Sequence, residues 1–258
     1  MHLILTGATG VVGSSVLDAM LKNKEVTTIS ILSRRPVPLA DQAQDPRVHV
    51  IIHEDFAQYP PEVLEQLKGA QGVVWALGVR PMTVGKEEYL RITKDYPTAA
   101  ASAFSSSLAT ETTEKDPFRF VFVSGAFATQ KPGPFHPLYA RTKGQTEARL
   151  SEIAAQSQGR FVVDSLRAST VDPTGHEAVL KVVPRDGVLK RLGFAANRVL
   201  VPAMYAPSEP LGRFLTGLAL GKYEAQLAEG GTEGAKVGRL PRVRLLENPM
   251  FRRLIGLP

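Results

Sequence analysis

Three side chains between positions 124 and 143 could together act on a carbonyl group. Tyr139 and Lys143 stand four positions apart in a helix expected over 137–158, so they share one helix face. A nearby ammonium favours the phenolate, so it lowers the pKa of a tyrosine from its free value of about 10. Ser124 ends an apolar strand expected over 118–124, where its hydroxyl could polarise a substrate oxygen while Tyr139 delivers the proton. The set predicts acid–base chemistry, with ordinary surface positions for Tyr139 and Lys143 as the alternative.

A glycine-rich turn at the start of the chain predicts a dinucleotide site. An apolar run over 2–6 leads into glycines at 7, 10 and 13 and then into an amphipathic helix over 11–22. The first glycine permits a tight turn, the second lets a pyrophosphate come close, and the third lets the helix pack on the sheet. The helix N-terminus adds partial positive charge for the phosphates. We expect the cofactor to contact Thr6, Gly7, Thr9, Gly10, Val11, Val12 and Gly13.

The end of the strand expected over 27–33 indicates which dinucleotide binds. Proteins that bind NAD commonly place a carboxylate here for the ribose hydroxyls. This chain instead has Ser33, Arg34 and Arg35, and two guanidiniums suit a dianionic 2′-phosphate. The sequence therefore predicts NADP(H), with solvent-facing arginines as the alternative.

The elements that must position these residues alternate along the chain. Strands are expected over 2–6, 27–33, 48–52, 72–77, 118–124 and 161–167, and helices over 11–22, 61–67, 86–106 and 137–158. The alternation predicts an α/β fold, a doubly wound parallel-sheet Rossmann domain over 1–258.

Prolines interrupt the pattern after about residue 168, and we expect residues 168–258 to form a small substrate cap. Its expected elements are a helix over 185–194, a strand over 198–201, a helix over 208–221 and a loop over 225–240. Residues 105–117 are expected to be a mobile surface insertion.

The glycine turn, the strand-end serine and the Tyr139/Lys143 pair resemble the short-chain dehydrogenase/reductase superfamily, in its extended or atypical branch. Within it the chain is most similar to the Tat-interacting-protein-like oxidoreductases, with likeness to about residue 170. The resemblance implies a hydride transfer between nicotinamide and a carbonyl, with Ser124, Tyr139 and Lys143 as catalytic residues. It further implies cofactor contacts at Ser33, Arg34, Arg35, Asp55, Phe56, Ala76, Leu77, Gly78, Tyr139, Lys143, Arg167 and Ala168. Thr93 stands where the extended branch often has an asparagine of the proton relay.

Three segments are expected to line the substrate pocket: 79–85, 125–138 and about 168–205. They contain the apolar side chains Phe127, Phe135, Val171, Phe194, Met204 and Tyr205. These favour an apolar or aromatic substrate over a sugar, and core packing is the alternative. Arg80 and His136 are candidates for contact with a polar substrate group, unless they are plain surface residues.

Composition narrows the remaining possibilities. The 258 residues are 43% apolar and 22% charged, as in globular proteins. The absence of cysteine excludes disulfides and thiolate catalysis, and five histidines without metal-ligand spacing indicate no metal site. Residues 181–258 hold 13 basic and 6 acidic residues, but these are scattered, which disfavours nucleic-acid binding. The start of the chain does not resemble a signal peptide, so we expect a cytoplasmic protein.

These observations predict an NADPH-dependent carbonyl reductase whose partner is a small-molecule substrate. We expect a monomer or homodimer, and the basic segment 251–255 is too short to favour a membrane contact. One alternative is an epimerase, dehydratase or isomerase of the extended type that retains its cofactor. The other is a non-catalytic protein that senses NADP.

Overall fold

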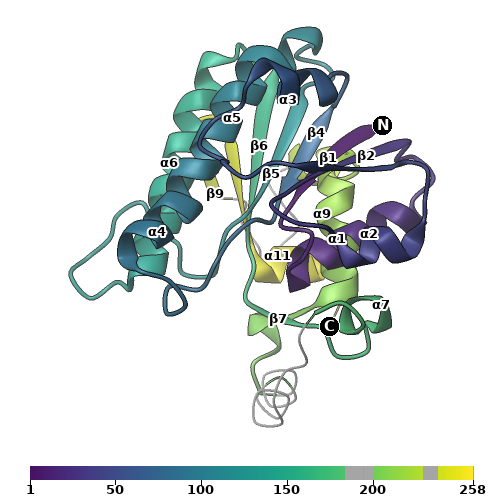
Figure 1. Cartoon of the computed structure of the whole chain (residues 1–258). Coiled ribbons are helices and arrows are strands. Elements are labelled where there is room, and N and C mark those ends of the chain that lie inside the picture. Colours follow the sequence, from purple (N-terminus) through teal and green to yellow (C-terminus); the bar gives the residue numbers. More distant parts are fainter. Residues whose placement is uncertain (184–193, 195–199, 229–237, 258) are drawn as a thin grey trace.

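A sheet of mostly parallel strands forms the centre of the molecule. The computed structural model describes residues 1–183, 194, 200–228 and 238–257. In this part of the chain the sheet has the order β3-β2-β1-β4-β5-β6-β10-β9 (Figure 1). Its strands are β1 (His2–Thr6), β2 (Thr28–Ser33), β3 (Val48–Ile52), β4 (Gly72–Trp75), β5 (Phe118–Val123), β6 (Phe161–Arg167), β9 (Gly238–Leu240) and β10 (Val243–Glu247). The strand order turns back on itself between β1 and β4, which confirms the doubly wound fold.

Parallel pairing explains why the central strands are apolar on both sides. Strands β1 to β6 and β10 all run parallel to their neighbours, whereas β9 pairs antiparallel with β10. Helices must then cover both faces, so strands such as β4 and β5 are buried almost throughout. All carboxyl ends of the parallel strands meet at one edge of the sheet, where ligands bind in folds of this kind.

Helices cover the two faces of the sheet in separate layers (Figure 1). One layer contains α1 (Val11–Lys22), α2 (Pro38–Ala43), α9 (Ser208–Ala219) and α11 (Asn248–Leu254). The other contains α3 (Pro61–Gln66), α4 (Lys86–Leu90), α5 (Tyr96–Ser107) and α6 (Leu138–Gln156), with a π-helical stretch over Arg91–Asp95 between α4 and α5. The short helices α7 (Glu177–Leu180) and α10 (Glu224–Ala228) pack against the first of these layers through Ala178 and Leu227. No helix in the described ranges has the length and apolarity needed to cross a membrane.

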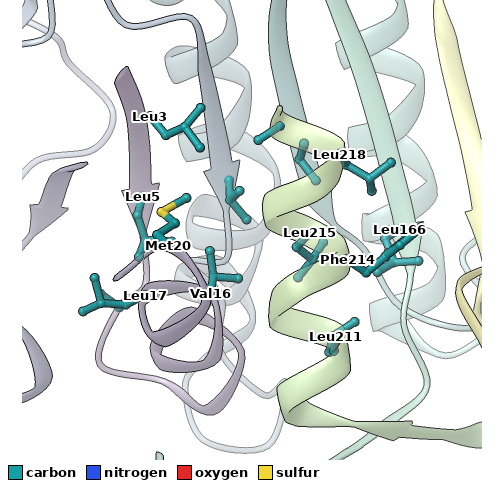
Figure 2. Close-up of a cluster of buried hydrophobic side chains, with 14 of the residues drawn as sticks. Leu3, Leu5, Val16, Leu17, Met20, Leu166, Leu211, Phe214, Leu215 and Leu218 are labelled. Carbon is teal, nitrogen blue, oxygen red and sulfur yellow. The ribbon is translucent and has the colours of Figure 1, made fainter. Parts of the chain in front are cut away.

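The first apolar core holds α1 and α9 against the sheet (Figure 2). Val16, Leu17 and Met20 point from α1 toward β1, while Phe214 and Leu215 point from α9 toward the central strands. The two helices approach closely, because a Cβ at Gly212 would lie 2.2 Å from the carbonyl oxygen of Ser15. The core on the opposite face is aromatic, and the stacked rings of Phe118 and Phe161 lie 5.6 Å apart there.

The C-terminal third contributes more to the main domain than we expected of a cap. Helix α9 packs on α1, and β10 adds to the sheet beside β6 with Leu245 opposite Ser165. The chain between β6 and α9 holds β7 (Thr170–Asp172) and β8 (Tyr205–Pro207), which form a separate two-stranded sheet. The burial of Leu211, Phe214 and Leu246 explains this placement, because these side chains complete the first core.

Several local expectations can be compared with the structure. The six expected strands and four expected helices are present, and their ends are shifted by at most two residues. The third helix, expected over 86–106, is interrupted by the π-helical stretch. The surface insertion expected over 105–117 is wrong for its first part, because α5 continues to Ser107, a 3₁₀ turn follows, and Leu108 and Ala109 are buried. Residues 110–116 are mostly exposed, as expected. A helix replaces the start of the loop expected over 225–240. The helix expected over 185–194 and most of the strand over 198–201 lie outside the described residues.

Candidate functional site

The turn after β1 has the backbone geometry of a phosphate-binding loop. Gly7 has φ +71°, and a Cβ there would lie 2.5 Å from the carbonyl oxygen of Ala76. A Cβ at Gly13 would lie 2.0 Å from the oxygen of Gly7, so α1 can approach only because this residue is glycine. Gly10 differs from both, because its added Cβ would meet only the Gly7 oxygen, at 3.5 Å. The space above Gly10 is therefore open to a ligand.

A dinucleotide fits the groups that surround this turn. The first helical N–H groups of α1, at Val11, Val12 and Gly13, have no acceptor within the helix and point toward that open side. The loop after β4 lies directly against the turn, where the Leu77 N–H donates to the Thr6 hydroxyl over 3.3 Å. A Cβ added at Gly78 would meet nothing within 4 Å, which leaves this loop open as well. The structure thus brings together the expected residues from β1, α1 and β4.

The end of β2 places two arginines beside the glycine turn. Both side chains are exposed, and among the described residues neither Arg34 nor Arg35 has a carboxylate partner. The Ser33 hydroxyl donates to the carbonyl of Arg35 over 2.7 Å, which fixes the local turn. The Arg35 guanidinium reaches Thr9 Oγ1 at 3.4 Å. At least one uncompensated cation therefore lies next to the space above the turn.

Ser124 and Lys143 meet at the carboxyl end of β5. The Lys143 ammonium donates to the carbonyl of Val123, the residue before Ser124, over 2.9 Å. It also lies 4.7 Å above the ring of Phe122, a cation–π contact. Ser124 is 6% exposed, and its buried Oγ has no hydrogen-bond partner in the described structure. Tyr139 lies one turn before Lys143 on α6 and is partly exposed, so all three groups are gathered at one strand end.

The pKa of the Lys143 ammonium is lowered to about 8. Its burial is the main cause, and the carboxylate of Glu147, one turn further along α6, acts in the opposite direction. That carboxylate is held by Arg167 and by the hydroxyl of Ser165, so it is not free to approach the lysine. A cation with a pKa of about 8, one helical turn from the Tyr139 phenol, makes the site sensitive to pH.

This pKa predicts that activity and stability change in opposite directions above pH 8. Ketone reduction should fall as pH rises through 8, because the ammonium that favours the Tyr139 phenolate loses its proton. The folded pKa lies below the unfolded value of 10.5, so the unfolded chain binds more protons between pH 8 and 10.5. The contribution of Lys143 to the free energy of unfolding therefore rises across that window.

Initial rates and urea unfolding at each pH check this expectation, with Lys143→Met as the matched variant. The variant should lack the alkaline decrease in kcat. The free energy of unfolding of the native protein should rise relative to that of the variant as the pH increases. This role for Lys143 would be contradicted if the kcat of the native protein fell only at those pH values at which its free energy of unfolding also falls.

Thr93 lies close to these groups, in the π-helical stretch. Its Oγ1 is buried without a partner among the described residues, and its carbonyl accepts from the Thr146 hydroxyl over 3.0 Å. Tyr89 is buried one turn earlier, and burial raises the pKa of its phenol, while the neighbouring Thr93 hydroxyl acts in the opposite direction and Tyr139 has a smaller raising effect. Irregular π-helical turns are frequent at functional sites. That Thr93 takes the place of the relay asparagine of the extended branch stays a prediction from the sequence.

The structure places the other residues expected to bind the cofactor in different surroundings. Phe56 is 1% exposed and packs edge-on against Trp75, so its side chain belongs to the aromatic core. Arg167 is held by Glu147 at 2.6 Å and by Glu247 at 2.9 Å, which gives it a structural role between α6 and β10. Asp55 is exposed after β3, where it accepts from the N–H of residue 57, and remains available to a ligand. The Ala168 carbonyl accepts from the Ala126 N–H over 2.9 Å and so braces the loop after Ser124.

The expected substrate residues fall into an exposed and a buried set. Phe127 is 64% exposed, and Arg80 and His136 are exposed on the same two loops, after β4 and β5. The His136 Nδ1 accepts from the Gly133 N–H over 2.9 Å, which gives that ring a structural partner. Phe194 and Tyr205 are buried, so for them the core-packing alternative is correct.

A buried Asp18–His176–Ser208 group has no signal in the sequence. The ring of His176 lies 3.0 Å from Asp18 Oδ2 and 2.9 Å from Ser208 Oγ, and it connects α1, α9 and the segment before α7. The residue types are those of a hydrolase triad. Ser208, however, is 1% exposed, so a substrate cannot reach its hydroxyl. The group stabilises the packing of α1, the helix that carries the phosphate loop, and its Asp18 and His176 stand 158 positions apart in the sequence.

Comparison with known proteins identifies the family. The model of the NAD(P)H-binding family matches residues 7–180, which span the glycine turn, Ser124 and the Tyr139/Lys143 pair. The chain belongs to this family. A leucinostatins biosynthesis cluster protein T from Purpureocillium lilacinum is 36% identical over 207 residues, which cover 71% of each chain. A botcinic acid biosynthesis cluster B protein 16 from Botryotinia fuckeliana is 40% identical over 149 residues, 54% of this chain and 87% of that one.

Solved structures of the short-chain dehydrogenase/reductase type share the fold of this NAD(P)H-binding protein. One from Serratia marcescens superposes with a TM-score of 0.60 at 14% identity, over 84% of this chain and 89% of the other. At this identity the likeness concerns the fold. Together with the family match, it confirms the superfamily expected from the glycine turn and the Tyr139/Lys143 pair.

Proposed function

We propose that this NAD(P)H-binding protein is an NADPH-dependent carbonyl reductase that acts on apolar or aromatic compounds. The observation that carries the proposal is the Ser124 hydroxyl, buried at the end of β5 without a protein partner in the described residues. A buried hydroxyl without a hydrogen bond is costly, so a substrate oxygen is its natural partner. Lys143 is anchored beside it, and Tyr139 lies one turn away. Two relatives are named for biosynthesis clusters, which supports a role in metabolite synthesis.

The side chains then divide the proton chemistry among them. Bound NADPH supplies a hydride to the carbonyl carbon. The Ser124 hydroxyl donates a hydrogen bond to the carbonyl oxygen and holds it within reach of the Tyr139 phenol. Tyr139 transfers its proton to that oxygen as negative charge develops there, so the product is an alcohol. The Lys143 ammonium stabilises the resulting phenolate.

The preference for NADPH over NADH depends on Arg34 and Arg35. Replacing both by alanine should raise the KM for NADPH by about 100-fold, because two charge-assisted bonds to the 2′-phosphate are lost. The KM for NADH should change less than threefold. Steady-state kinetics with each cofactor measure both effects, and Arg149→Ala, an exposed arginine on α6, serves as the control. Equal changes for the two cofactors would contradict the assignment.

NADPH oxidation in the presence of a panel of ketones and aldehydes tests the reductase proposal directly. Consumption of one NADPH per carbonyl reduced is the expected result. Tight NADPH binding without consumption across the panel would favour the non-catalytic sensor instead. A tightly retained cofactor that copurifies with the protein and is not consumed in turnover would favour an epimerase or dehydratase.

A further inference from the structure

Three large apolar side chains are exposed beside the proposed active site. Met82 is 98% exposed, Phe135 is 96% exposed and Phe127 is 64% exposed, which places them among the four most exposed large apolar residues of the described chain. Met82 lies on the loop after β4, and the two phenylalanines lie on the loop after β5. Figure 1 shows these loops at the lower end of the sheet, beside α4. We call these three side chains the apolar rim.

Each rim residue occupies the same corner of a hydrogen-bonded turn. The Thr83 N–H donates to the Arg80 carbonyl, that of Ala128 to Gly125, and that of His136 to Gly133, over 3.0, 3.1 and 3.2 Å. In all three four-residue turns the third position carries the rim side chain. Such corners usually hold glycine, asparagine or another small polar residue. The large apolar side chains at these three turn positions therefore differ from the residues that loops usually place there.

The backbone at Phe127 is held in an unfavourable conformation. Its φ is +67°, in the left-handed region, where a bulky aromatic residue is a clear outlier. Strain of this kind persists where the surrounding structure imposes it and is concentrated at functional positions. The backbone here directs the ring outward, three residues after Ser124.

The turn that carries Phe135 is rigid. Besides the turn bond, the Gly133 N–H donates to His136 Nδ1, and the Arg141 guanidinium donates to the carbonyls of Pro134 and His136. An exposed aromatic ring on a preorganised turn loses little conformational entropy when a ligand covers it. The ring is thus ready to bind an apolar group.

We propose that the substrate carries a long apolar chain, which lies across the rim while its carbonyl oxygen meets Ser124 and Tyr139. This inference rests on the proposed reductase function and specifies its substrate class. Phe127 follows Ser124 by three residues and Phe135 precedes Tyr139 by four, so one elongated molecule can reach both the rim and the proposed proton donor. Exposed Glu87 and Glu88 lie in the first turn of the adjacent α4 and balance the exposed Arg80 and Lys86, so the charge at this place does not favour an anionic membrane surface.

The probes are straight-chain 2-ketones from 2-butanone to 2-dodecanone. With the native protein, kcat/KM should rise about two- to fourfold for each added methylene until the chain passes the rim. A Met82→Ser, Phe127→Asn, Phe135→Ser triple variant should lose at least tenfold more activity toward 2-dodecanone than toward 2-butanone. Asparagine at 127 tolerates the left-handed backbone, so this change does not add strain. Ile52→Thr, at an exposed apolar residue of β3, should keep the native dependence on chain length.

Calorimetric titration of the NADPH-loaded protein with 2-alkanols, which cannot accept a hydride from the reduced cofactor, decides the inference without turnover. The dissociation constant should fall with chain length in the native protein and change little in the triple variant. Equal affinity for short and long alkanols would overturn the proposal, even if all ketones are reduced. Reduction of no ketone would count against the reductase function, whereas the titration still tests the rim.

Two controls separate other occupants of the rim. In size-exclusion chromatography, a smaller elution volume for the native protein than for the triple variant would assign the rim to contact between copies of the chain. Sedimentation with phosphatidylcholine–phosphatidylglycerol vesicles that the triple variant loses would assign it to a membrane. Either result would overturn the substrate proposal.

Discussion

Tyr139→Phe should lower kcat for ketone reduction by about 10²- to 10⁴-fold while NADPH binding stays within twofold of native. The change removes only the phenolic oxygen, so the group that protonates the substrate oxygen is lost. The helix position and the contact of Lys143 with the Val123 carbonyl do not depend on that oxygen. The chemical step therefore loses its acid, and the cofactor keeps its site.

Stopped-flow or steady-state rates give kcat, and the fluorescence of Trp75 gives NADPH binding. Trp75 is the only tryptophan of the chain and ends β4, the strand that leads into the loop beside the glycine turn. Tyr223→Phe, a change of the same kind at a partly buried tyrosine after α9, should leave kcat near native. More than a tenth of native kcat in Tyr139→Phe would exclude its phenol as the main proton donor.

Gly10→Ala and Gly13→Ala should have large but different effects. At Gly10 the backbone has φ −95° and ψ 168°, which alanine adopts readily, and the added Cβ has room beside the protein. The free energy of unfolding should change by less than about 1 kcal/mol. That same Cβ occupies the approach of the pyrophosphate, so the dissociation constant for NADPH should rise about 100-fold.

At Gly13 the added Cβ would collide with the Gly7 carbonyl oxygen at 2.0 Å, which neither backbone can avoid without moving. We expect this variant to lose about 3 kcal/mol of unfolding free energy. Urea unfolding and NADPH titration of both variants distinguish the two roles. Native NADPH affinity in Gly10→Ala would show that the pyrophosphate does not lie over this residue.

The sequence by itself determined the parts of this protein that depend on near neighbours in the chain. The glycine turn lies within residues 1–13, Arg34 and Arg35 follow one strand directly, and Tyr139 and Lys143 stand one helical turn apart. Strand and helix periodicity then required a parallel sheet whose carboxyl edge gathers Ser124 and the phosphate loop. Short-range geometry is set by local residue types, so these features could be predicted.

Only the tertiary structure decided which residues pair across long distances. Strand β10 joins the sheet beside β6, with Leu245 opposite Ser165, and no local pattern in the sequence specifies this register. Arg167 pairs with Glu147 and Glu247, and the aromatic core buries Phe56, contacts that no local pattern in the sequence specifies. The exposure of Met82, Phe127 and Phe135 likewise follows from where three turns fall in the folded chain. Burial and charge pairing depend on which elements pack together, and packing depends on the whole chain.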